Sequence, residues 1–241
     1  MSTWRIVLTA ALLQVSAHAL AQGANACGSL ENHYGPYDYR VERNGHLRIV
    51  ERYHFTPQVE ALVRGESGYI GADLDYTLHT SPNHHRALMA LVRYGERLKT
   101  TQPPAMPYSI DCYFDRAIRY QPDDTVVREL FAQYLAKSGR AKEAKEQLVV
   151  ASNYAKDNAI SHYNIGLIYF DLKDYDHALE QAQLAGEEGF PRPELREKLK
   201  EVGKWQDPPA AASAPAASGA SAVSTVSAAS AASAATATAQ Q

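Results

Sequence analysis

The chain repeats itself with a period of 34 residues, and this repeat limits its fold more than any other feature. Segments 125–158 and 159–192 align without gaps. Five aligned positions carry a small or apolar residue in both segments: Ala132 and Gly166, Leu135 and Tyr169, Ala144 and Ala178, Leu148 and Ala182, Ala151 and Ala185. A unit of this length cannot bury its own apolar face, so neighbouring units are expected to stack.

The second segment also carries a recognisable motif. The pair Ile165-Gly166 is followed by Tyr169, which matches the Leu-Gly-x-x-Tyr pattern of tetratricopeptide repeats, with His162 in place of the family's Trp. Ala178 stands where that family has a small residue. Small residues at these positions let the two helices of a repeat approach closely. The chain therefore resembles the tetratricopeptide-repeat (TPR) family.

The resemblance implies an all-α fold: a right-handed α-solenoid of about three to four helix–turn–helix repeats, with an irregular N-terminal cap and a C-terminal capping helix. We expect its parts to be a degenerate repeat at 51–82, a repeat with an insertion at 83–122, regular repeats at 125–158 and 159–192, and the capping helix at 193–205. Ser81 and Pro82 are predicted to begin a helix as N-cap and first helical residue. Asp124 and Asn158 are predicted as further N-caps.

The N-terminus has the pattern of a signal peptide over residues 1–21. Arg5 precedes an apolar run at 6–15, and Ala19-Leu20-Ala21 supplies the small-x-small cleavage pattern. We therefore expect cleavage after Ala21 and export to the periplasm, with secretion as the alternative. No later run approaches the roughly 18 apolar residues of a membrane span, so no membrane span is expected.

The C-terminal segment, 206–241, consists almost wholly of Ala, Ser, Thr and Pro, with Asp207 as its only charge. Such a composition cannot bury enough apolar surface to offset its ordering entropy. We expect a disordered tail; the alternative is a stalk with sugars on its Ser and Thr side chains.

The charge balance argues against nucleic acid as a partner. The formal charge of −3 becomes −4 when Arg5 is removed with the signal peptide, and a mildly acidic chain has no electrostatic attraction to phosphate. Two cysteines, Cys27 and Cys112, survive cleavage. In an oxidising compartment we expect them to form a disulfide; two free thiols or a lipid on Cys27 are the alternatives.

No catalytic constellation is visible in the sequence. Cys-x-x-Cys, His-Glu-x-x-His, phosphate-loop and Rossmann glycine patterns are all absent. His84 and His85 are adjacent, and on a helix they would point about 100° apart, which disfavours chelation of one metal. We therefore predict no enzyme activity, no cofactor and no metal.

A tyrosine-rich segment occupies residues 22–50 and is expected to be irregular. Tyr34, Tyr37 and Tyr39 surround a Gly-Pro turn, and Arg40 follows them. These side chains either pack on the first helices as a cap or form a platform for a ligand, and the sequence favours neither decisively.

Peptide-binding members of the family contact ligands through the first helix of each repeat, on the concave face. By position, the resemblance implies this groove: Glu129, Gln133, Lys137, Tyr163, Leu167 and Phe170. Acidic and amide side chains at 129 and 133 disfavour a reader of terminal carboxylates. The resemblance thus implies an exported module for protein–protein interaction with an unidentified protein or peptide, as an accessory or scaffold in envelope, secretion or pilus assembly. The alternative is an envelope enzyme or a small-ligand-binding protein that uses the tyrosine-rich segment.

Overall fold

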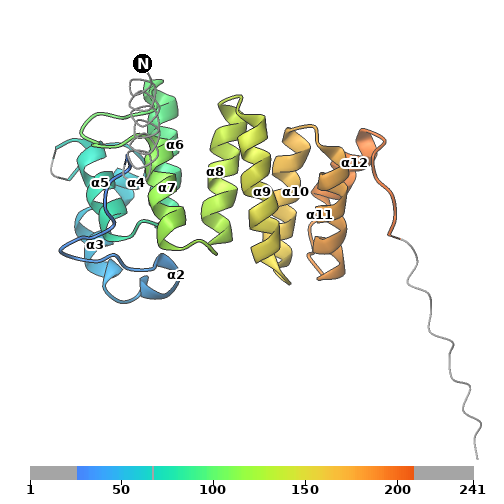
Figure 1. The fold of residues 1–241 in the computed structure, drawn as a ribbon, viewed down its shortest axis with the longest axis horizontal. Coiled ribbons are helices and arrows are strands. Elements are labelled where there is room, and N and C mark those ends of the chain that lie inside the picture. Colours follow the sequence, from blue (N-terminus) through green and yellow to red (C-terminus); the bar gives the residue numbers. More distant parts are fainter. Residues whose placement is uncertain (1–25, 67, 209–241) are drawn as a thin grey trace, which may run out of the picture. The chain divides into compact units, whose positions relative to one another are not determined.

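The computed structural model describes residues 26–66 and 68–208, so the predicted signal peptide and nearly all of the predicted tail lie outside the described residues. Within these ranges it contains eleven helices and no strand, which confirms the all-α class. Figure 1 shows the helices and their labels. Their bounds are α2 Tyr39–Glu42, α3 Leu47–Tyr53, α4 Pro57–Glu60, α5 Ile70–Thr80, α6 His85–Leu98, α7 Ile110–Tyr120, α8 Thr125–Lys137, α9 Ala141–Ala155, α10 Ala159–Asp171, α11 Tyr175–Glu187 and α12 Glu194–Glu201. No helix in the described ranges is long and apolar enough to cross a membrane.

Two helical hairpins dominate the half of the molecule that carries the 34-residue period. Helix α8 packs along α9 and α10 along α11, while α10 also contacts α8 and α9. The predicted N-caps are confirmed: Asp124 accepts a hydrogen bond from the Val127 N–H, and Asn158 accepts one from the Ser161 N–H. Helix α12 packs against α10 and α11 at the end of this series.

Gly166 lies at one of the closest helix contacts. A Cβ atom placed there would lie 2.5 Å from the Leu195 Cδ2 atom and 3.2 Å from the Gln181 Cβ atom. The Ala178 side chain is fully buried beside it. Small residues at 166 and 178 therefore allow α10, α11 and α12 to meet.

The start of α6 differs from the prediction. The helix begins at His85 rather than Pro82, and its N-cap is His84, whose Nδ1 accepts a hydrogen bond from the Ala87 N–H. Ser81 instead lies in the turn after α5, with φ −140° and ψ 91°. The Ser81 carbonyl accepts the His84 N–H and so closes a turn that contains Pro82 and Asn83. The helix can start only after this turn.

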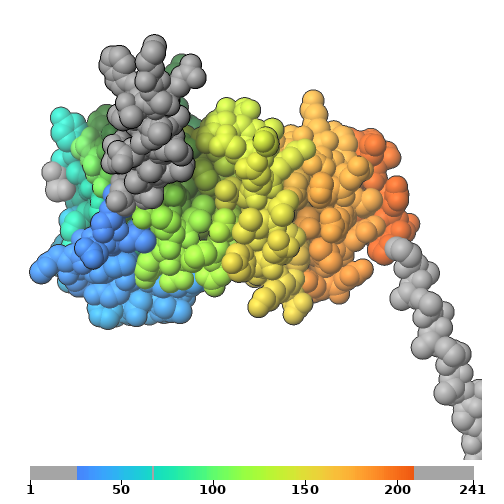
Figure 2. Space-filling model, in the orientation of Figure 1, coloured from blue at the N-terminus to red at the C-terminus, as the bar shows by residue number. Residues whose placement is uncertain are grey.

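The N-terminal region, residues 26–66, contains more helix than the sequence predicted. Helix α2 lies inside the segment expected to be irregular, and α3 crosses the predicted boundary between residues 50 and 51. The predicted disulfide between Cys27 and Cys112 is present, with a Cα–Cα distance of 5.0 Å, and attaches the beginning of this region to α7. In Figure 2 the blue part of this region lies against the surface coloured green.

A second attachment lies at the Gly-Pro turn. The Tyr37 N–H donates to the Thr80 carbonyl over 2.8 Å, and the Tyr120 hydroxyl donates to the Pro36 carbonyl over 3.0 Å. Gly35 has φ +111°, and a Cβ there would lie 2.5 Å from the Thr80 carbonyl oxygen. Glycine is therefore required for this close approach.

Candidate binding surface on the N-terminal region

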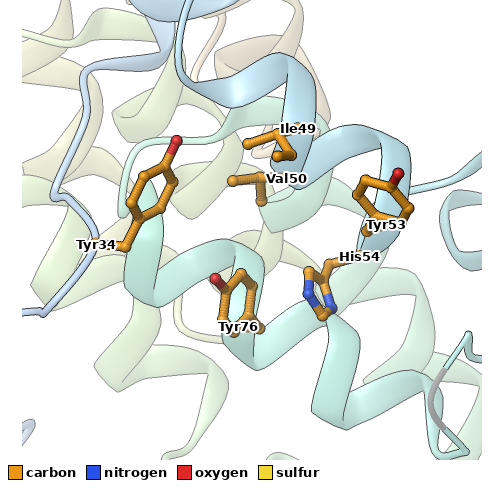
Figure 3. A pocket seen from close by; sticks show the side chains of 6 residues that line it. All are labelled: Tyr34, Ile49, Val50, Tyr53, His54 and Tyr76. Atoms are coloured by element: carbon orange, nitrogen blue, oxygen red, sulfur yellow. The ribbon is translucent and has the colours of Figure 1, made fainter.

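An open pocket of about 330 Å³ lies beside α3 and α5 and is called the aromatic pocket below. Figure 3 shows its lining side chains: Tyr34, Ile49, Val50, Tyr53, His54 and Tyr76. Three of these are unusually exposed for large apolar residues, with Tyr53 at 58%, Ile49 at 55% and Tyr76 at 42%. The pocket is thus a cluster of solvent-facing rings around an apolar floor that includes buried Val50.

The His54 side chain is fixed by a contact with Asp73. Its Nδ1 lies 3.0 Å from Oδ1 of Asp73, a fully buried carboxylate on α5. The second oxygen of Asp73 accepts the Glu66 N–H over 2.7 Å. The imidazole in turn packs on the Tyr76 ring, with 3.9 Å between the ring centroids. A buried carboxylate therefore fixes one wall of the pocket.

Tyr34 forms the opposite wall and belongs to a ring cluster at the start of α3. Its ring meets the Tyr37 ring edge-on at 5.1 Å between centroids, and Tyr37 stacks on His46 at 4.4 Å. Desolvation, followed by the neighbouring Tyr37 and Tyr76 hydroxyls, raises the pKa of Tyr34. Tyr34 is therefore a neutral hydroxyl at physiological pH; it donates to the His46 carbonyl over 3.3 Å, which leaves its oxygen as an acceptor.

Tyr39 and Arg40, the other members of the predicted aromatic cluster, lie elsewhere. Tyr39 is 3% exposed and packs on the His84 ring, with 4.2 Å between centroids. Arg40 pairs with Asp38 over 2.7 Å and with Asp123 over 3.1 Å. The structure thus divides the predicted cluster: Tyr34 lines the pocket, Tyr37 supports it, and Tyr39 and Arg40 attach the segment to the body of the protein.

Asn83 is the centre of this attachment. Fully buried, it donates to Asp38 Oδ1 over 2.7 Å and to Asp124 Oδ2 over 2.8 Å, and it accepts the Tyr39 N–H over 3.0 Å. Burial acts to raise the pKa of Asp124, but the hydrogen bonds led by that from His85 outweigh it, so the pKa is lowered. Both carboxylates are therefore ionised and well partnered, which suits a structural role.

His84 beside it is a neutral cap. Its Nδ1 accepts the Ala87 N–H, so Nε2 carries the proton that faces Glu51 Oε1 over 3.1 Å. Burial lowers the pKa of His84. The residue is thus unavailable as a metal ligand, and no group of three or more His, Cys, Asp or Glu side chains in the described ranges is placed to hold a metal ion.

The six residues of the predicted groove do not share one exposed face. Glu129 and Tyr163 are buried; Asn164 Nδ2 donates to Glu129, and the Tyr163 hydroxyl donates to Glu194 Oε2 over 2.6 Å. Leu167 and Phe170 are half-buried against the core, whereas Gln133 and Lys137 are exposed. Lys137 pairs with Glu96 over 3.1 Å. In this structure two of the predicted groove residues are therefore occupied by contacts within the protein: Glu129 with Asn164 of α10, and Tyr163 with Glu194 of α12.

Sequence reasoning did not find Tyr53, His54 and Tyr76 as site residues. Ile49 and Tyr53 are four residues apart on α3, a spacing that places both on one helix face. That spacing alone does not say whether the face is buried or open. The pocket arises only when α3 meets α5, which no local pattern predicts.

Comparison with known proteins adds no relative. No family model, no curated protein and no solved structure matches the chain.

Proposed function

We propose that the protein is an exported member of the TPR class that binds a protein partner, as an accessory or scaffold in envelope, secretion or pilus assembly. The α8/α9 and α10/α11 hairpins, whose N-caps Asp124 and Asn158 are 34 residues apart, support a stacked-repeat interpretation, as does the buried Gly166. Helix α12 then serves as the cap that keeps the last apolar face from water.

The observation that carries the binding function is the aromatic pocket. Its rings are rigid, amphipathic and exposed, and aromatic residues of this kind supply much of the energy at protein interfaces. Surface aromatics gathered in one place mark an interaction site more often than scattered ones do.

Site-specific photo-crosslinking in the native host tests this proposal. A photoreactive amino acid at Tyr53, which lines the pocket, is expected to give a discrete crosslinked product with one partner. The matched control is the same replacement at Val149, an exposed apolar residue on α9. Equal products from both positions, or none from Tyr53, would contradict a partner at the pocket.

Export is tested separately. Intact-mass analysis of protein recovered from the periplasm and from the medium is expected to show a chain that begins at Gln22 and contains one disulfide. A mass that includes residues 1–21 in the cytoplasmic fraction alone would contradict export.

A small-ligand binder is the second candidate, because a volume of about 330 Å³ lies within the range of small-molecule pockets. Native mass spectrometry of protein purified from its host distinguishes the two. A bound small molecule that is lost on Tyr76→Ser would favour this candidate over a protein partner.

A further inference from the structure

The aromatic pocket continues into a second hollow of about 300 Å³, which we call the arginine hollow. The two hollows share Ile49 and Tyr53, so they lie side by side on α3. The remaining lining residues of the arginine hollow are Asn44, Gly45, Arg48 and Arg52. One continuous surface therefore joins exposed rings to two guanidinium groups.

The two arginines carry charges that no acidic side chain in the described ranges neutralises. Arg48 and Arg52 are exposed, and neither forms an ion pair with any residue that the structure describes. Their positions explain this, because residues 48 and 52 are one helical turn apart on the outer face of α3, while Leu47 and Val50 face the core.

The nearby carboxylates are already engaged elsewhere. Glu42 contacts His46 over 2.9 Å, Glu51 contacts His84 over 3.1 Å, and Asp73 contacts His54 over 3.0 Å. The hydrogen bond from His46 lowers the pKa of Glu42, and the hydrogen bond from His84 lowers that of Glu51. None of these carboxylates pairs with Arg48 or Arg52, so both guanidinium groups remain available to a ligand.

We infer that this joint surface binds an acidic peptide segment of the partner protein, with an apolar side chain in the aromatic pocket and a carboxylate at Arg48 and Arg52. The inference rests on the proposed protein-binding function and specifies the partner's chemistry. Guanidinium groups pair with carboxylates through two parallel hydrogen bonds, whereas a cationic ligand would be repelled by both arginines. An uncharged ligand would leave both arginines unused.

Fluorescence anisotropy with defined peptides tests the charge requirement on the mature chain, residues 22–241. The probe is a short peptide with one central Phe flanked by Asp; the comparison peptides replace every Asp with Asn or with Lys. We expect the Asp peptide to bind, the Asn peptide to bind about tenfold more weakly, and the Lys peptide not to bind. Added salt should weaken the Asp peptide most.

Variants locate the binding. Arg48→Glu with Arg52→Glu is expected to reduce affinity for the Asp peptide at least about tenfold, and Tyr76→Ser is expected to reduce it without changing the salt dependence. Lys142→Glu, at an exposed position on α9, also reverses a positive charge and is expected to leave the affinity for the Asp peptide unchanged. Unchanged circular dichroism and melting temperature in each variant show that folding is intact.

The outcomes separate this inference from the proposed function. Equal affinity for the Asp and Asn peptides, or no effect of reversing both arginines, would overturn the acidic-peptide inference. If Tyr53 still crosslinks to a partner in that case, the protein-binding function stands with a different partner chemistry. If the charge dependence is absent and Tyr53 also gives no crosslinked partner, the acidic-peptide inference and the proposed protein-binding function are both wrong.

Discussion

The two halves of the described chain are assembled by different kinds of contact. From α8 to α12, helices that are consecutive in sequence pack on each other through small and apolar residues. Residues 26–50 are attached instead through contacts between distant residues: Asn83 bonds Asp38 across 45 residues, Arg40 bonds Asp123 across 83, and the disulfide spans 85. Their buried side chains form a small cluster of their own, whereas Phe55, Val59 and Leu62 already belong to the main core. Local apolar packing therefore holds α8 to α12 together, and long-range polar and covalent contacts position the segment 26–50 beside the candidate site.

The largest effect is expected from the disulfide. Replacing Cys27 and Cys112 by Ser is expected to lower the free energy of unfolding by about 4 kcal/mol, because the loop that the bond closes is long. Hydrogen exchange should show the loss first in residues 27–42 and leave α10 and α11 protected. Chemical denaturation measures the total. Uniform loss of protection from residue 27 to α12 would mean that the disulfide stabilises the whole molecule rather than its N-terminal attachment.

The second effect concerns a buried carboxyl group on α8, that of Glu129, and depends on pH. Burial raises the pKa of Glu129 from 4.5 to about 7, and its Oε1 atom has no hydrogen-bond partner among the described residues. The folded state thus holds a proton that the unfolded state releases above pH 4.5. The stabilisation from this group is fully present below pH 4.5 and is lost as pH rises through 7. The free energy of unfolding falls by about 3 kcal/mol over this range.

Glu129→Gln removes that pH dependence. Relative to the wild type, the variant is expected to gain stability between pH 4.5 and 8, because the amide keeps an acceptor for Asn164 without a charge. Denaturation at several pH values measures the difference. Glu146→Gln, at an exposed position on α9, should follow the wild-type profile. Parallel profiles for Glu129→Gln and the wild type would contradict the buried protonated carboxyl.

The third effect tests the close packing of α10 against α11 and α12. Gly166→Leu is expected to cost about 2 kcal/mol, since even a Cβ atom meets Leu195 and Gln181. Gly186 is the matched control, because it also lies in a helix but a Cβ atom placed there would have no described atom within 4 Å. Gly186→Leu should raise stability by about 0.5–1 kcal/mol through helix propensity. Equal effects would show that α10, α11 and α12 do not meet at residue 166.

The difference between the halves also explains how much of the fold can be predicted from the sequence. Helix N-caps such as Asp124 and Asn158, and the small residue at 166, act within or between adjacent helices, so their spacing is visible in the chain. His84 is not predicted as a cap because histidine is not among the residue types preferred at N-caps.

The candidate site is predicted only in part, for the same reason. Tyr34 stands out in the sequence as an aromatic near a turn, but Tyr53 and Tyr76 belong to different helices that meet only in three dimensions. Tyr39 resembles Tyr34 in sequence context, yet it is buried against His84 because Asn83 binds its backbone N–H. Residue type indicates an aromatic segment, and long-range contacts decide which ring faces solvent.

The smallest effect addresses the polar attachment directly. Asn83→Ala leaves the buried Tyr39 N–H without its partner and removes a donor from two carboxylates, so we expect a loss of about 1–2 kcal/mol. Exposed Asn44→Ala should cost far less. In the background that lacks the disulfide, Asn83→Ala is expected to cost less than in the wild type, because both contacts hold the same segment and their effects are then not additive. Denaturation of the four proteins in this cycle measures the coupling; strictly additive losses would mean that the two attachments stabilise separate parts of the molecule.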